Sequence, residues 1–119
     1  ANMRHGVKIR TLSRTRRGRT ALLRSLAVSL IEKGKIQTTS AKAKELRPFA
    51  ERLVTYGKKG TVVSRRLAAT VLGEPKAAVI KKLFDDLAVK YTDRQGGYTR
   101  ITKIGRSSAG RDEAVIEFV

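Results

Sequence analysis

The N-terminal segment, residues 1–19, limits what this chain can fold into more than any other stretch. It contains seven arginine and lysine residues and His5, and the first carboxylate of the chain comes only at Glu32. Ordering one residue costs about 1–2 kcal/mol of backbone entropy. The five apolar side chains of the segment follow no helical or strand period, and each would return only about 1.5–3 kcal/mol if buried. We therefore expect the segment to be disordered alone and to become ordered on a polyanion, which supplies charge-assisted hydrogen bonds and releases counterions.

The rest of the chain is basic as well. From Thr20 onward it carries 20 basic and 10 acidic residues, and the whole chain has a net charge of +17 at pH 7. This excess exceeds what solubility requires and is typical of proteins that bind nucleic acid. Arginine outnumbers lysine six to one in residues 1–19, and its planar fork can donate two hydrogen bonds to one phosphate. Because the chain has only three tyrosines, three phenylalanines and no tryptophan, recognition of folded RNA by shape and phosphate fits better than base stacking.

The residue inventory gives little support to an enzyme. There is no cysteine, which excludes disulfides and thiolate metal sites. The single histidine, His5, belongs to no cluster, and Gly96 and Gly97 lack the glycine series of a nucleotide-binding loop. No apolar run approaches the roughly 20 residues of a membrane span. We expect no catalytic residue, metal site, cofactor, small-molecule substrate or membrane partner.

Apolar periodicity predicts one α+β domain over residues 20–119, preceded by the basic arm of residues 1–19. Helices are expected over residues 21–33, 41–56 and 62–72 and after Pro75, with caps at Thr20, Ser40 and Thr61. Strands are expected over residues 35–39, 98–104 and 114–119. The last two strands should pair as an antiparallel hairpin with the first at one edge. The expected fold is about four helices packed on a small three-stranded mixed sheet, with an extended N-terminal arm.

Two of the expected helices carry sharper expectations. Pro48 lies inside the second one, where it removes a backbone hydrogen bond and crowds the preceding turn, so we expect a kink or break near Glu45. In the third helix, the candidates for burial are Val63, Leu67, Val71 and Leu72. The clearest apolar stripe lies in the fourth helix and includes Leu83.

Several segments, taken in chain order, match the motifs of one protein family. They are MRHG at 3–6, LLR at 22–24, LAVSLI at 26–31, IQTT at 36–39, AKELRP at 43–48, DRQGGYTRI at 93–101 and AVIEFV at 114–119. These segments resemble the seventeenth large-subunit ribosomal protein family of bacteria. The resemblance implies an α/β body with a basic extension, which binds large-subunit ribosomal RNA near the exit of the peptide tunnel. It also implies other large-subunit proteins as neighbours, and residence in a cytoplasmic ribosome or, alternatively, an organellar one.

Ala1 and Asn2 precede the methionine at which that family usually starts. An unusual start, a processed organelle precursor and a cloning remnant are the alternatives.

The expected RNA contacts come from this resemblance and from the charge pattern. The resemblance points to Arg4, His5, Gly6, Arg10, Arg14, Arg19 and Arg24, followed by Arg94 and Arg100. The charge pattern adds Lys8, Arg16, Arg17, Lys42, Lys44, Arg47, Lys58 and Lys59. For any one cation of the body, a solvated surface position is about as plausible as RNA contact. The alternative function is a DNA-binding or nucleoid-compacting protein, for which the third helix, with Arg65 and Arg66, is the one candidate reader.

Overall fold

The computed structural model describes residues 15–119. The contacts expected at Arg4, His5, Gly6, Lys8, Arg10 and Arg14 lie outside the described residues. The elements are α1 (Arg16–Lys33), β1 (Lys35–Thr39), α2 (Ser40–Lys59), α3 (Val62–Val71), α4 (Ala77–Lys81), the π-helix η1 (Lys82–Leu87), α5 (Ala88–Lys90), β2 (Thr99–Arg106) and β3 (Asp112–Phe118). Because α4, η1 and α5 run on from one another, they form the expected fourth helix, and the α+β fold is confirmed. None of the described helices combines the length and the apolar character needed to cross a bilayer.

The sheet has the order β1-β3-β2 and is antiparallel throughout. The expectation of a mixed sheet is wrong, because β3 lies between the two strands that run in the same direction and separates them. The register places Ile36 and Ile101 on either side of Ile116. These three isoleucines form an apolar row that packs against the helices.

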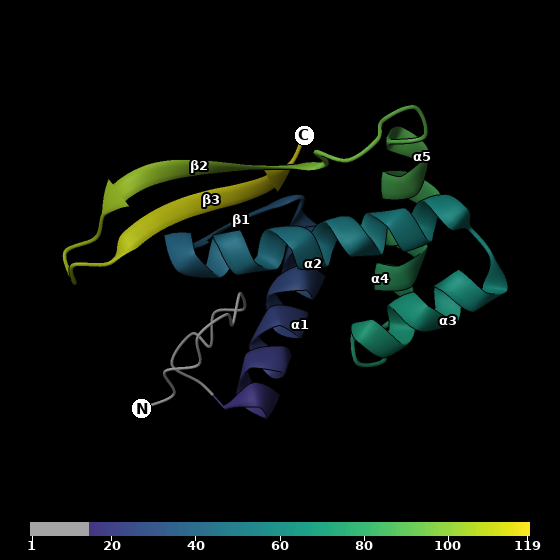
Figure 1. The fold of residues 1–119 in the computed structure, drawn as a ribbon, viewed down its shortest axis with the longest axis horizontal. Helices are drawn as coiled ribbons and strands as arrows, with labels where there is room; N and C mark the ends of the chain where they lie inside the picture. Colours follow the sequence, from purple (N-terminus) through teal and green to yellow (C-terminus); the bar gives the residue numbers. More distant parts are fainter. Residues whose placement is uncertain (1–14) are drawn as a thin grey trace, which may run out of the picture.

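The core lies where α2 passes between the sheet and the other helices (Figure 1). Leu30 of α1, Leu46 and Leu53 of α2, Leu83 of η1 and Ile116 of β3 are all fully buried there. Each such side chain contributes about 1.5–3 kcal/mol of burial free energy. The apolar stripe predicted for the fourth helix is therefore confirmed at Leu83.

Helix α1 begins at Arg16, earlier than the sequence pattern predicted. Thr15, rather than Thr20, caps it, because the Thr15 hydroxyl accepts a hydrogen bond from the backbone N–H of Gly18 at 3.1 Å. The Thr20 hydroxyl instead donates to the Arg16 carbonyl at 3.0 Å. Arg16, Arg17 and Arg19 thus belong to the first turn of α1. Gly34, with φ 82°, ends the helix as predicted.

Helix α2 continues through Pro48 without interruption, so of the kink or break expected near Glu45, the break does not occur. Both Pro48 and Lys44 are exposed. The Lys44 carbonyl, which loses its helical partner to the proline, can therefore be solvated. The cap is Thr39, whose hydroxyl accepts from the Lys42 N–H at 3.3 Å, rather than Ser40.

Helix α3 confirms only part of the expected burial. Leu72 is buried and Val71 packs against the core, as expected. Val63 and Leu67, however, are 67 % and 46 % exposed, and Ser64 and Ala68 are buried instead. A reciprocal cap at the start of the helix bonds the buried Ser64: Ser64 Oγ accepts from the Thr61 N–H, and Thr61 Oγ1 accepts from the Ser64 N–H, both at 3.0 Å. Ser64 can therefore be buried without leaving an unpaired polar group. The apolar spacing predicted the wrong face for the first two turns of α3 and the right residues at its end.

Candidate nucleic-acid interface

The cations predicted to contact RNA separate into two groups in the structure. One group makes side-chain hydrogen bonds or ion pairs inside the protein: Arg19, Arg24, Arg47, Lys58 and Arg100. In the other group, the side chains have no such partner anywhere in residues 15–119: Arg16, Arg17, Lys42, Lys44, Lys59 and Arg94. The second group is available to an external anion without breaking any contact of the fold.

The open cations at the start of α1 line a shallow depression. Arg16 and Arg17 lie there with Thr20, Ala21 and Arg24. Arg16, Thr20 and Arg24 are spaced four residues apart and so share one face of the helix. The N-terminal end of α1 is the positive end of the helix dipole, and no acidic residue in the first turn offsets it. The guanidinium groups of Arg16 and Arg17 in the first turn, with Arg24 two turns further along, attract phosphate.

Arg24 also joins α1 to α3. Its Nε donates to the Val71 carbonyl at 3.0 Å and its Nη2 to the Thr70 carbonyl at 3.5 Å, so the guanidinium covers the negative end of α3. Gly73, with φ +76°, leaves room for this contact, because a Cβ there would lie 3.1 Å from Arg24 Cδ. The Arg24 side chain therefore positions α3 while its charge remains at the edge of the α1 depression.

Arg19 joins α1 to α2 through an ion pair with Glu45. The two side chains are only 19 % and 9 % exposed. The pair therefore anchors the first turn of α1 to the N-terminal half of α2. Because Lys42 lies three residues before Glu45, it shares a face of α2 with this pair.

A second group of contacts fixes the loop between α5 and β2. The Lys58 ammonium donates to the Arg94 carbonyl and, at 3.0 Å, to Tyr98 Oη, while the Tyr98 hydroxyl donates to the same carbonyl at 3.1 Å. The hydrogen bond from Lys58 lowers the pKa of Tyr98. Gly96 and Gly97 complete the turn with φ values of 79° and 63°. Lys58 thus positions the loop, whereas the exposed Arg94 side chain is free to meet a ligand.

Two further predicted cations are paired with carboxylates. Arg100 lies opposite Glu117 in the sheet register and donates to Glu117 Oε1 from Nε at 3.0 Å and from Nη2 at 2.7 Å. Arg47 Nε lies 3.3 Å from Glu51 Oε2, which also accepts from Thr99. These pairs lower the local net charge. The prediction that Arg47 and Arg100 contact RNA stays a prediction.

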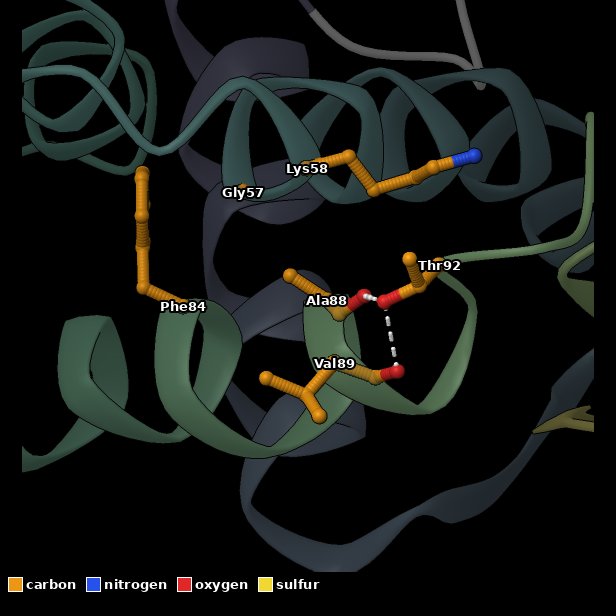
Figure 2. A pocket seen from close by; sticks show the side chains of 6 residues that line it. All are labelled: Gly57, Lys58, Phe84, Ala88, Val89 and Thr92. Carbon is orange, nitrogen blue, oxygen red and sulfur yellow. Dashed lines mark hydrogen bonds between the residues drawn. The ribbon is translucent and has the colours of Figure 1, made fainter.

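The cavity of Figure 2 lies between the C-terminal end of α2 and η1–α5. It has a volume of about 170 Å³ and is lined by Gly57, Lys58, Phe84, Ala88, Val89 and Thr92. Its polar lining groups are already bonded: the Lys58 ammonium reaches away from the cavity to the 94–98 loop, and the Thr92 hydroxyl donates to the Val89 carbonyl at 2.8 Å. Among residues 15–119, no three His, Cys, Asp or Glu side chains gather in a way that could hold a metal ion.

The structure also exposes cations that the sequence analysis did not select. Arg52, Lys103 and Arg111 have open, exposed side chains within the described range. A signal for the last two was present in the sequence. Residues 103–111, at the end of one final strand and in the connection to the next, contain three basic residues. Whether these side chains are exposed depends on how far the two strands extend, which no local pattern predicts.

Comparison with known proteins gives a consistent match over nearly the whole chain. A family model described as ribosomal protein L17 matches residues 22–119. The large ribosomal subunit protein bL17 of Sphingopyxis alaskensis is 52% identical over 118 residues, which cover 98% of this chain and 84% of that protein. Its counterpart in Hydrogenobaculum sp. is 50% identical over 119 residues, covering 98% and 99% of the two chains. The bL17 protein of Gemmatimonas aurantiaca is 51% identical over 118 residues, covering 98% of each.

Proposed function

This chain belongs to the ribosomal protein L17 family, and from this premise we propose that it is a structural constituent of the large ribosomal subunit. In this role it binds 23S-type ribosomal RNA near the exit of the peptide tunnel and contacts neighbouring large-subunit proteins. Its relatives are named large ribosomal subunit proteins and come from bacteria, and the chain is accordingly a component of the ribosome in the cytoplasm. The protein acts as a scaffold, in keeping with a family whose members are structural components rather than enzymes.

The observation that carries the RNA-binding part of this proposal is the cluster of cations around the start of α1. Arg16 and Arg17 are open, Arg24 adds a third guanidinium, and Lys42 shares a face of α2 with the Arg19–Glu45 pair. This cluster continues directly from residues 1–14, which contain no acid. A positively charged surface of this kind binds RNA phosphates and releases counterions.

The DNA-binding alternative has weaker support. A helix that reads base edges in the major groove needs polar side chains on its outer face. The outer face of α3 instead presents Val62, Val63 and Leu67, and the Arg65 guanidinium lies over the Phe84 ring, 5.1 Å from its centroid. Arg66 is the one open arginine on that helix.

Sedimentation of the full chain through a sucrose gradient tests the proposed function. The chain, tagged and expressed in a bacterium, should migrate with large subunits and stay there after a wash at moderate salt. Migration near the top of the gradient, or with small subunits, would contradict the proposal. A fusion carrying the same tag on an unrelated basic protein controls for nonspecific adsorption.

A further inference from the structure

The β2–β3 hairpin extends beyond the helices that cover the rest of the sheet (Figure 1). From Thr102 to Asp112 every residue is exposed except Ser107, which is half-buried. The ladder shifts register between Lys103 and Gly105, and Gly105 takes a φ of +107°, which favours glycine. This outer part of the hairpin contributes no side chain to the buried core.

The hairpin tip is nevertheless held by its own hydrogen bonds. The Ser107 N–H donates to the Arg111 carbonyl at 2.8 Å, and the Gly110 N–H donates to the Ser107 carbonyl at 2.9 Å. Ser107 Oγ accepts from the Arg111 N–H at 3.2 Å, and Arg106 Nε lies 3.2 Å from Asp112 Oδ1. Because the tip is already ordered, binding there loses little conformational entropy.

The charges of this outer part favour an anionic partner. Lys103 and Arg111 are exposed, and neither side chain has a hydrogen-bond or ion-pair partner within residues 15–119. The turn just before Arg111, residues 107–110, carries only small side chains, so a phosphate backbone can come close to the peptide backbone there. Ile104 is the one large apolar side chain that is exposed there, at 51 %. A surface with so little apolar area fits RNA phosphates better than a protein partner.

We propose that the tip of the β2–β3 hairpin is a second RNA-binding element, separate from the cluster at the start of α1. Lys103 and Arg111 contact phosphates of the large-subunit ribosomal RNA, and the hairpin fixes the orientation of the body on it. This inference rests on the proposed function, since it names a further contact with the same RNA.

The test compares two full-length double variants that remove the same charge. Lys103→Gln with Arg111→Gln removes the two open cations of the tip. Lys76→Gln with Lys81→Gln removes two exposed cations at α4, on the other side of the molecule, which also lack partners in the described part of the chain. Binding to 23S-type rRNA transcribed in vitro is measured over a range of salt concentrations. Since none of the four side chains has a hydrogen-bond or ion-pair partner within residues 15–119, thermal melts of both variants should match that of the wild type.

The hairpin variant should lose about tenfold or more in affinity, because each charge-assisted phosphate contact alone is worth about that much. The slope of log affinity against log salt should fall by about two, one for each contact removed. The α4 variant should change affinity by less than about threefold, as expected for long-range attraction alone. Hydroxyl-radical footprinting should show that the hairpin variant loses one localised set of protected nucleotides and keeps the rest.

Equal losses in the two variants, or no loss in the hairpin variant, would overturn the proposal for the hairpin. Either result leaves the proposed function intact as long as the wild type binds 23S-type rRNA better than duplex DNA. A wild type without that preference would instead refute the proposed function itself. A footprint that stays unchanged in the hairpin variant would likewise overturn the hairpin contact.

Discussion

At the scale of single residues, charge alone does not say what a cation does. Lys58 and Lys59 are neighbours in the sequence and were both predicted to contact RNA. The structure gives them different roles: Lys58 bonds to the Arg94 carbonyl and to Tyr98, whereas Lys59 is exposed and has no side-chain partner within residues 15–119. Their difference depends on where the 94–98 loop comes back to α2, and no local pattern in the sequence encodes that.

This pair gives a matched test. Lys58→Met should lower the free energy of unfolding by about 1–3 kcal/mol, because the Arg94 carbonyl and the Tyr98 hydroxyl lose a charged donor. Lys59→Met should change it by less than about 0.5 kcal/mol. Urea denaturation measures both values, and hydrogen exchange should speed up over residues 94–98 in the first variant only. Equal effects of the two substitutions would show that Lys58 does not hold the loop.

At the scale of elements, the close approach of α2 to the fourth helix depends on Gly57. A Cβ added at Gly57 would lie 3.0 Å from Ala88 Cβ and 3.2 Å from the Leu83 carbonyl oxygen. The backbone of η1 at Leu83 can therefore lie directly against α2. The sequence pattern predicted the buried Leu83 but did not predict that a glycine on the facing helix makes its position possible.

Gly57→Ala should therefore destabilise the protein by about 1–3 kcal/mol through overpacking. Helix propensity alone predicts the opposite sign, a gain of about 1 kcal/mol. Ala88→Gly removes the methyl group that the new one would meet, so the double variant should be more stable than the sum of the two single effects. Stabilisation by Gly57→Ala in chemical denaturation would contradict the close packing of α2 against η1.

The start of α1 gives a second test at this scale. Because the Thr15 side chain caps the helix, Thr15→Ala should cost about 0.5–2 kcal/mol of stability. Thr20→Ala removes a hydroxyl that bonds inside the helix to the Arg16 carbonyl, and should cost less. Thermal melts of the two variants measure the difference. A larger loss at Thr20 would mean that the helix begins where the apolar pattern placed it.

At the scale of the whole molecule, the sequence predicted the α+β class, the strands and most helix ends, because apolar periods and caps such as Thr61 and Gly34 are local signals. It failed where distant contacts decide. The Arg19–Glu45 pair holds the first turn of α1, the Arg24 side chain bonds to the end of α3, and β3 lies between β1 and β2. The candidate interface shows the same division. The cation-rich segments were identified, but which cations remain open follows only from the fold.

The claim on which the account depends is that this basic surface is matched to large-subunit ribosomal RNA and not to nucleic acid in general. The most direct measurement is competition binding of the full chain to 23S-type rRNA against duplex DNA of equal phosphate concentration, at the same physiological salt. Nonspecific attraction falls steeply with salt for both polymers, whereas a shape-matched complex retains additional contacts. We predict that the chain stays on the ribosomal RNA. Equal affinity for the two polymers would contradict the account.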